Sequence, residues 1–207
     1  GCVHWLVGSS SDSGIYDMWK EVGVAGEMQT INMDEYMRFE DKDGRKLIFY
    51  TNINRLEKHL LDFSPQDAKP IQDFIKGIRL CLPFNSLSRK AKPGKRARQM
   101  IKLSSALLLN RRKIKKWLNT SARDFASGIK DPLLRDAFIK MWFPDFSMFF
   151  ILITFAYMHE KNAGYPIGGS LPLSRAMAHR YETLGGVIHY KRRVEKIITK
   201  NDKATGI

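Results

Sequence analysis

The chain has 207 residues and a formal net charge of +14 at pH 7, from 35 Lys and Arg against 21 Asp and Glu. Hydrophobic residues make up 43% of it and aromatic residues 11%, which excludes a disordered or collagen-like chain and favours one globular domain, or one domain with an insert. Cys2 and Cys81 are too few for a disulfide framework or a thiolate zinc site. They favour a reducing compartment, so we expect a cytoplasmic location.

The chain shows no targeting or membrane-spanning pattern. Its first ten residues lack the basic start and long apolar run of a signal peptide. The longest apolar stretch, residues 146–158, is shorter than the ~20 residues that a membrane-spanning helix needs, so it predicts a buried helix. The chain opens directly into a strand-like pattern and stops inside a predicted hairpin. This indicates a piece of a longer protein.

The first third of the sequence predicts a strand, a helix and a β-hairpin. Residues 3–7 are typical of a short strand, and a helix is expected from residue 14, with Asp12 or Ser13 as its N-cap. Apolar and polar residues alternate on both sides of Asp43 and Gly44, which is typical of a hairpin with a tight turn. A short helix is expected from residue 54.

Helices dominate the prediction for the middle of the chain. Residues 64–67, Ser-Pro-Gln-Asp, are a helix-start signature for a helix over 65–82. The spacing of apolar residues predicts a further helix over 100–118. Another starts at the Asp-Pro pair 131–132, and the apolar helix over 146–158 follows it.

The last forty residues change character. Residues 165–169 form a turn-rich loop, and a helix is expected over 170–184, ended by the glycine pair 185–186. Strands are expected over 187–190 and 194–199.

These elements predict an α+β fold, a mixed or antiparallel sheet that carries a large and mostly helical insert. We expect the sheet-forming part over residues 1–63, the helical insert over 64–160, and a return to the sheet-forming part over 161–207. The last of these parts would also reach the edge of a neighbouring domain.

Positive charge is concentrated in one segment. Between Phe74 and Arg123 there are 15 Lys and Arg and no acidic residue. Three interpretations of this segment are possible. It could be a solvated helix face beside a loop, a surface that docks on anionic lipid headgroups, or a nucleic-acid interface. The last is disfavoured because Trp117 is the only aromatic residue between Phe84 and Phe125, and base stacking needs more. The candidate residues for docking on a membrane or another anion are Arg111, Arg112, Lys113, Lys115 and Lys116.

No catalytic motif stands out. The sequence has no GxGxxG, P-loop, CxxC, HExxH or GxSxG motif, and its five histidines are scattered without i, i+4 pairs. No pair of Asp residues lies at a close helical spacing that would support paired-carboxylate chemistry. We therefore predict no metal site and assign no catalytic residue.

The most informative pattern lies near the C-terminus. A Pro-x-Gly-Gly loop precedes a helix, a second glycine pair follows the helix, and a Val-x-x-Ile strand comes next. This order resembles the phytoene desaturase, carotenoid isomerase and retinol saturase family of FAD-dependent oxidoreductases. The earlier elements agree with that family in order, so the resemblance spans most of the chain. The residues that carry it are Pro166, Gly168, Gly169, Leu173, Gly185, Gly186, Val194 and Ile197.

The resemblance implies a two-lobed flavoprotein. One lobe of such enzymes holds FAD with an N-terminal glycine-rich loop, and the other lobe holds the substrate. Because this chain lacks that loop, the resemblance places it mainly in the substrate lobe, with the missing FAD-binding lobe of the same protein as its partner. We expect the chain alone to bind no FAD and to be inactive. The resemblance places Gly168 and Gly169 near the flavin and Val194 on the adenine side of FAD.

The implied substrate is a lipophilic polyene or isoprenoid-like molecule that is desaturated, saturated or isomerised. The aromatic and methionine run over 141–158 is expected to be mostly core, with a minority of residues lining an apolar tunnel. Because such substrates live in bilayers, the basic residues would dock the enzyme on anionic lipid as a peripheral membrane protein. The alternative is a non-catalytic basic module that docks on an anionic membrane or an acidic partner. The candidate substrate-pocket residues are Phe146, Phe149, Phe150 and Tyr165.

Overall fold

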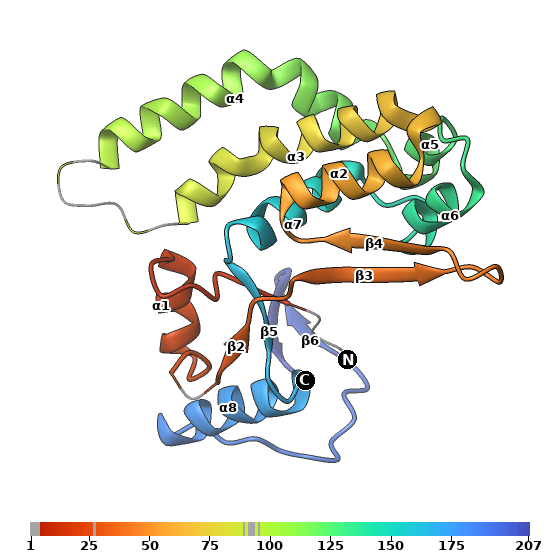
Figure 1. Cartoon of the computed structure of the whole chain (residues 1–207). Helices are drawn as coiled ribbons and strands as arrows, with labels where there is room; N and C mark the ends of the chain where they lie inside the picture. Colours follow the sequence, from red (N-terminus) through yellow and green to blue (C-terminus); the bar gives the residue numbers. More distant parts are fainter. Residues whose placement is uncertain (1–4, 27, 89, 91–93, 95) are drawn as a thin grey trace.

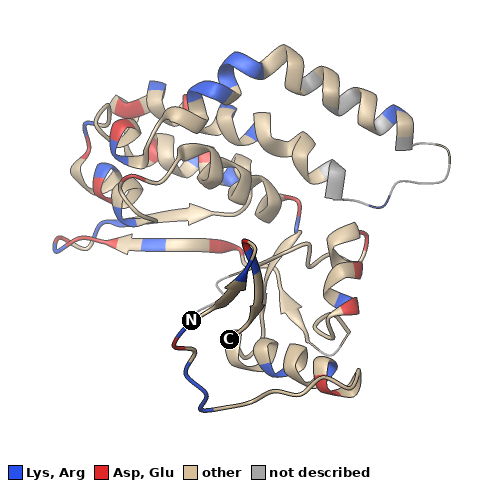
Figure 2. Ribbon diagram, turned by 180° about the vertical axis from the view of Figure 1, so that it is seen from behind, with Lys and Arg blue, Asp and Glu red and all other residues tan. Residues whose placement is uncertain are grey.

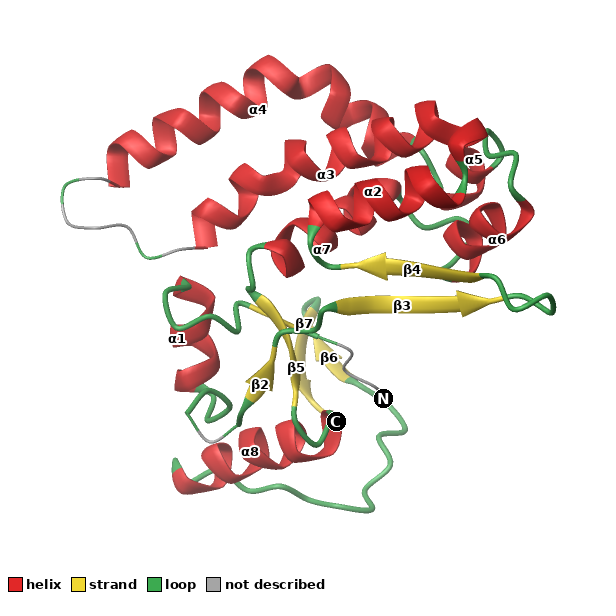
Figure 3. Cartoon of the chain, viewed as in Figure 1, coloured by secondary structure: helices red, strands yellow, loops and turns green. Residues whose placement is uncertain are grey.

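The structure is a computed structural model that describes residues 5–26, 28–88, 90, 94 and 96–207. It has the α+β fold that the sequence predicts, with antiparallel strand pairs in each sheet (Figure 1). Figure 3 shows two groups of elements, a helical layer stacked on a long β-hairpin and a smaller group around a short three-stranded sheet.

The β-hairpin forms where the sequence alternates. β3 (Glu35–Glu40) pairs antiparallel with β4 (Lys46–Tyr50). In the turn, Gly44 has a φ of +78°, a left-handed conformation that glycine adopts without steric cost. Leu47 and Phe49 of β4 are completely buried, so one face of the hairpin points into the hydrophobic core.

Helices cover that face of the hairpin, and their apolar residues complete the main hydrophobic core. In chain order they are α2 (Ile53–Phe63), the 3₁₀ turn η1 (Pro65–Asp67), α3 (Ala68–Ser88), α4 (Arg96–Asn119), α5 (Ala122–Ala126), α6 (Pro132–Lys140) and α7 (Met148–His159). α3 packs against α2, α4 and α7, and α4 lies on the side of α3 away from the hairpin (Figure 1). The basic helix α4 is therefore the outermost layer.

α7 is the apolar helix that the sequence predicts over 146–158. Its residues Ile151, Leu152 and Phe155 are completely buried in the main core, which confirms that it is a buried helix. Among the helices of the described residues, none is both long and apolar enough to cross a membrane.

α3 is longer than the sequence predicts. The sequence indicates an end near Leu82, but the helix continues through Pro83 to Ser88. The ring of Phe84 packs edge-on against Phe149 of α7, with the ring centroids 5.6 Å apart. This tertiary contact offsets part of the local cost of a proline inside a helix.

The smaller group is built around β5 (Ala163–Pro166). β1 (Leu6–Val7) pairs antiparallel with one edge of β5, and β2 (Thr30–Ile31) pairs antiparallel with the other. Since β5 follows α7 after three residues, it ties this small sheet to the helical layer.

Two helices accompany the small sheet. α1 (Gly14–Glu21) is capped by Ser13, whose hydroxyl accepts a hydrogen bond from the N–H of Ile15. α8 (Ser170–Thr183) lies close to α1, and the Arg180 guanidinium donates a hydrogen bond to the carbonyl oxygen of Glu21. A second, smaller hydrophobic cluster joins these elements through Leu6, Val24 and Leu173.

The C-terminal segment differs from the sequence prediction. α8 ends at Thr183 with Leu184 as its C-cap, and the next residue, Gly185, has a φ of +88°, as expected of the glycine that follows a helix C-cap. Of the two strands predicted over 187–190 and 194–199, the first is not formed, and the second is reduced to β6 (Ile198–Lys200), which pairs with β7 (Lys203–Gly206). The residues before β6 are largely exposed and pair with no strand of the described chain. Without a neighbouring strand, an isolated segment has no ladder of hydrogen bonds to make it a strand.

His59 joins α2 to the hairpin. Its Nε2 accepts a hydrogen bond from the N–H of Ile48, 3.0 Å away, and only a neutral imidazole can accept in this way. Burial lowers the pKa of His59, while the charge of Asp62 acts in the opposite direction with a smaller effect. Protonation of His59 therefore competes with this hydrogen bond.

We predict that stability falls as His59 becomes protonated. A histidine whose pKa is lower in the folded state contributes stability that is fully present above its unfolded pKa, about 6.5, and that is lost as the pH falls through its folded pKa. Urea unfolding at pH values from about 7.5 to about 5 should show a decreasing free energy of unfolding. His59→Gln keeps an acceptor that does not titrate, so its pH dependence should be shallower. If the free energy of unfolding fell equally steeply with pH in the wild type and in His59→Gln, the prediction would be contradicted.

Candidate functional site

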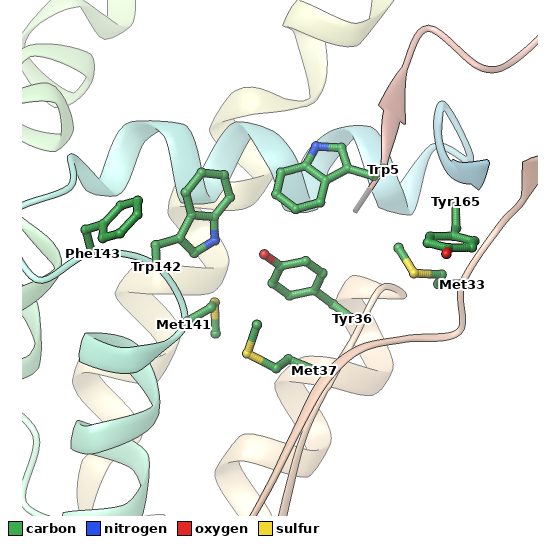
Figure 4. Close-up of a pocket in the computed structure, with 8 residues that line it drawn as sticks. All are labelled: Trp5, Met33, Tyr36, Met37, Met141, Trp142, Phe143 and Tyr165. Carbon is green, nitrogen blue, oxygen red and sulfur yellow. The ribbon is translucent and has the colours of Figure 1, made fainter. Parts of the chain in front are cut away.

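A pocket of about 510 Å³ lies where the helical layer, the hairpin and the small sheet meet (Figure 4). Pockets of this size, with mostly apolar walls and few polar groups, are typical sites for small lipophilic molecules. Its walls are aromatic and methionine side chains from segments far apart in the sequence. They are Trp5, Met33, Tyr36, Met37, Met141, Trp142, Phe143 and Tyr165.

A break in the hairpin pairing brings two neighbouring residues of β3 to this pocket. Along a regular strand, Tyr36 and Met37 would point to opposite faces. The register shifts between Glu35 and Met37, which leaves Tyr36 outside the ladder. This irregularity re-aims the two side chains, as β-bulges do near functional sites, and both line the pocket.

Aromatic contacts hold the pocket walls in place. Trp5 packs edge-on against Tyr36 and at an angle against Trp142, with ring centroids 5.6 and 5.2 Å apart. Two further rings support these walls from the side of the core. Phe146 stacks on Trp142 and Phe155 packs edge-on against Tyr36, with ring centroids 4.7 and 5.3 Å apart. The site is therefore continuous with the hydrophobic core, which fixes the ring orientations.

Tyr36 and Trp142 bring polar atoms to this apolar site. The Tyr36 hydroxyl faces the indole ring of Trp142 (Figure 4). Burial raises the pKa of Tyr36 to about 12, and the indole N–H of Trp142 opposes this only in part. The contact falls short of regular hydrogen-bond geometry, since the buried Nε1 of Trp142 has no hydrogen-bond partner among the described residues.

The structure places the four predicted substrate-pocket residues differently. Tyr165 lines the pocket. Phe146 does not line it but stacks on Trp142, which does. Phe149 packs against Phe84 and Phe150, and neither Phe149 nor Phe150 lines this pocket. The sequence analysis missed Trp5, Met33, Tyr36 and Met37, because their position beside Trp142 follows from long-range packing and from the break in β3. Their aromatic and methionine character was the only signal in the sequence.

The Gly168–Gly169 turn lies beside the pocket. Both residues have positive φ, +88° and +75°. A Cβ on Gly168 would lie 2.9 Å from the Cγ of Pro172, and one on Gly169 would lie 3.5 Å from the Tyr165 hydroxyl. The N–H of Gly169 already donates to the carbonyl of Pro166 within the turn. The glycines thus allow a tight turn into α8, and Tyr165 reaches across it.

Val194 lies about half exposed in the segment before β6. It borders an open hollow of about 780 Å³ whose walls come from the segment 187–198 and the last residue, Ile207. The expectation that the chain alone binds no FAD stays a prediction.

The predicted docking residues share one exposed stretch of α4. Arg111, Arg112, Lys113, Lys115 and Lys116 are all exposed, and Figure 2 shows blue stretches of Lys and Arg along this outer helix. No acidic side chain pairs with any of them in the part of the chain that the structure describes. The preceding turns of the same helix expose Ile101, Leu108 and Leu109 by 69%, 65% and 83%. Apolar and basic side chains therefore follow one another along the outer surface.

Nothing in the described residues groups three or more His, Cys, Asp or Glu side chains in a way that would hold a metal ion. His59 and His159 both accept hydrogen bonds from backbone N–H groups, of Ile48 and Ile53. These two histidines therefore hold the fold together. Burial raises the pKa of the Cys81 thiol to about 12, so it is an unreactive core residue.

Comparison with known proteins gives one distant similarity. The chain is 24% identical over 198 residues to a phytoene desaturase (lycopene-forming) from Paracoccus sp. (strain N81106 / MBIC 01143). The match covers 92% of this chain but 38% of the length of that protein. No family model and no solved structure matches the chain. The similarity supports a distant relation to phytoene desaturases, in agreement with the resemblance seen in the sequence.

Proposed function

We propose that the chain is the substrate-binding part of an FAD-dependent oxidoreductase that acts on a lipophilic polyene or isoprenoid-like molecule. The aromatic and methionine pocket is the observation that carries the proposal, and the distant similarity to a phytoene desaturase supports it. The chain spans 38% of the length of that protein, and we propose that the activity belongs to a larger protein that contains this chain.

The pocket residues would bind the substrate, orient it and exclude water. The faces and edges of Trp5, Tyr36 and Trp142 suit a flat conjugated chain, which they would hold by burial of apolar surface and by ring contacts. The methionines at 33, 37 and 141 adapt to the remaining irregular space. No acid–base pair is needed for such a role, since in flavoenzymes the cofactor carries the redox chemistry.

The partner that would complete the site is an FAD-binding lobe of the same protein. Apolar side chains are exposed along the C-terminal segment, and a patch of this kind marks an interaction surface. The Gly168–Gly169 turn and Val194 would then lie at the border between the lobes. The exposed apolar residues are Leu184, Val187, Tyr190, Val194, Ile197, Ile198 and Ile207.

One experiment tests the proposed function through the pocket. Phe143, which is 73% exposed at the pocket, would be replaced by arginine in the protein carrying its natural flanking sequences. The wild type should purify with FAD, and anaerobic addition of a polyene that the enzyme desaturates should bleach the flavin absorption band, because desaturation would pass two hydrogens and their electrons from the polyene to the flavin. Phe143→Arg should retain FAD but lose the bleaching, because a hydrocarbon chain bound over the arginine would strip water from its charge, which is costly.

Phe150→Arg is the matched control, since Phe150 is also exposed but does not line the pocket. This variant should keep the bleaching. A wild type without flavin, or equal bleaching in both arginine variants, would overturn the proposal.

We propose in addition that α4 docks the enzyme on anionic membranes, where its lipophilic substrate is dissolved. The exposed Ile101, Leu108 and Leu109 would enter the headgroup region. The basic residues that follow them would meet lipid phosphates, with about 1 kcal/mol of attraction for each residue near the surface.

Charge reversal on α4 tests this docking. Changing Arg112, Lys115 and Lys116 to glutamate should weaken binding to vesicles containing about one third phosphatidylglycerol by at least about tenfold at low salt. Changing Arg192, Arg193 and Lys196, another exposed basic group, gives the same change in net charge and should weaken binding much less. Co-sedimentation provides the measurement, and equal losses in the two triple variants would contradict the α4 assignment.

A further inference from the structure

The polar atoms of the pocket limit what its ligand can be. Only the tyrosines and tryptophans among its eight lining residues carry a side-chain nitrogen or oxygen atom. The Tyr165 hydroxyl lies by the Gly168–Gly169 turn. The Tyr36 hydroxyl instead projects from the middle of the pocket wall, between the rings of Trp5 and Trp142 (Figure 4).

The contact between Trp142 and Tyr36 has a fixed direction. An indole nitrogen can only donate a hydrogen bond, so Trp142 cannot accept one from the Tyr36 hydroxyl, and the Tyr36 hydrogen stays available. No carbonyl or carboxylate oxygen of the described residues accepts a hydrogen bond from this hydroxyl. With its pKa raised to about 12, Tyr36 keeps its proton throughout the physiological range and can donate it.

We propose that Tyr36, oriented by Trp142, donates a hydrogen bond to an oxygen atom of the ligand, so that the pocket selects an oxygen-bearing polyene over a pure hydrocarbon. The inference rests on the proposed function and names the substrate class of the same pocket. A hydrocarbon would cover the Tyr36 hydroxyl and leave its hydrogen without an acceptor, and an unpaired buried donor is costly. An alcohol, ketone or aldehyde oxygen placed over Tyr36 removes that cost.

The test compares two ligands that differ in one group. The probes are all-trans-retinol and the hydrocarbon in which its hydroxyl is replaced by hydrogen, and quenching of tryptophan fluorescence reports binding, with Trp5 and Trp142 in the pocket wall. The wild-type protein should bind retinol about tenfold more tightly than the hydrocarbon, the ratio expected of one hydrogen bond to a buried donor.

Tyr36→Phe removes the hydroxyl and keeps the ring, so the preference for retinol should disappear while the hydrocarbon binds at least as well as before. Tyr181→Phe is the matched control and should keep the preference, because Tyr181 is an exposed residue of α8 that does not line the pocket. Thermal unfolding of both variants checks that the fold is retained.

The outcomes separate the inference from the function on which it rests. Equal affinity for the two ligands in the wild type, or a preference that survives in Tyr36→Phe, would overturn the inference and leave the polyene pocket standing. Failure of the wild type to bind either ligand would overturn the pocket assignment as well.

Discussion

Replacing Asp67 with alanine is expected to lower the free energy of unfolding by about 3 kcal/mol, since it removes the acceptor of several buried donors. The Asp67 carboxylate is 1% exposed and accepts hydrogen bonds from the N–H groups of Lys130 and Asp131, at 2.7 and 2.9 Å, and from the Ser64 hydroxyl at 2.7 Å. It thereby ties the start of α3 to the start of α6. Without it, the donors stay buried and unpaired.

The pH dependence provides a second measure of the same interaction. Burial by itself raises the pKa of Asp67, but the donated hydrogen bonds from Asp131, Lys130 and Ser64 outweigh burial and hold the pKa below its usual value. A carboxylate of this kind contributes stability that is fully present above its unfolded pKa, about 3.9, and that is lost as the pH falls through its folded pKa. The stability difference between wild type and Asp67→Ala should therefore shrink below about pH 4.

Urea unfolding at neutral and acidic pH measures both effects. Asp62→Ala, a change of the same kind at an exposed residue of α2, should alter the free energy of unfolding by less than about 0.5 kcal/mol. A loss for Asp67→Ala no larger than that of Asp62→Ala would show that the carboxylate does not link the two segments.

Replacing Phe155 with alanine is expected to cost about 3–5 kcal/mol of stability, as for other buried phenylalanines. The side chain is fully buried, and its ring contacts those of Tyr36, Phe49 and Phe74, with centroids 5.3, 6.2 and 5.7 Å apart. It therefore joins α7 to both strands of the hairpin and to α3. Because Tyr36 lines the pocket, the cavity left behind should also loosen the pocket wall.

Chemical denaturation and retinol binding measure the two consequences of Phe155→Ala. Phe155→Leu, which keeps most of the volume, should lose less stability and retain binding. Phe150→Ala on the same helix removes a ring that is about half exposed, so it should cost less than about 1 kcal/mol. Equal losses for the two alanine variants would contradict the central place of Phe155 in the core.

Local chemistry made much of the fold predictable. Ser13 caps α1, Asp131 caps α6, and the alternation around Gly44 gives the hairpin. Each of these signals acts within a few residues of the chain, through a cap hydrogen bond, a φ angle or the period of a strand. The sequence likewise indicated the buried apolar helix α7 and the exposed basic residues of α4. The boundaries predicted for the domains stay a prediction.

The pocket depended on long-range packing. Tyr165 was predicted, but Trp5, Tyr36 and Trp142 come from three segments that only the folded chain brings together. In a regular strand, the neighbouring residues Tyr36 and Met37 would point to opposite faces. Because the register of β3 shifts between Glu35 and Met37, both side chains line the pocket instead. Likewise, the strand predicted over 187–190 lacks a neighbour with which to pair.

The sequence by itself therefore determined most of the segments that are helices, where most of them start, and which stretch carries the charge, because those properties depend on near neighbours along the chain. The tertiary structure decided which rings share a wall, which carboxylate is buried, and which predicted strand forms. Those outcomes depend on contacts between residues far apart in the sequence, such as Asp67 with Asp131 or Tyr36 with Trp142.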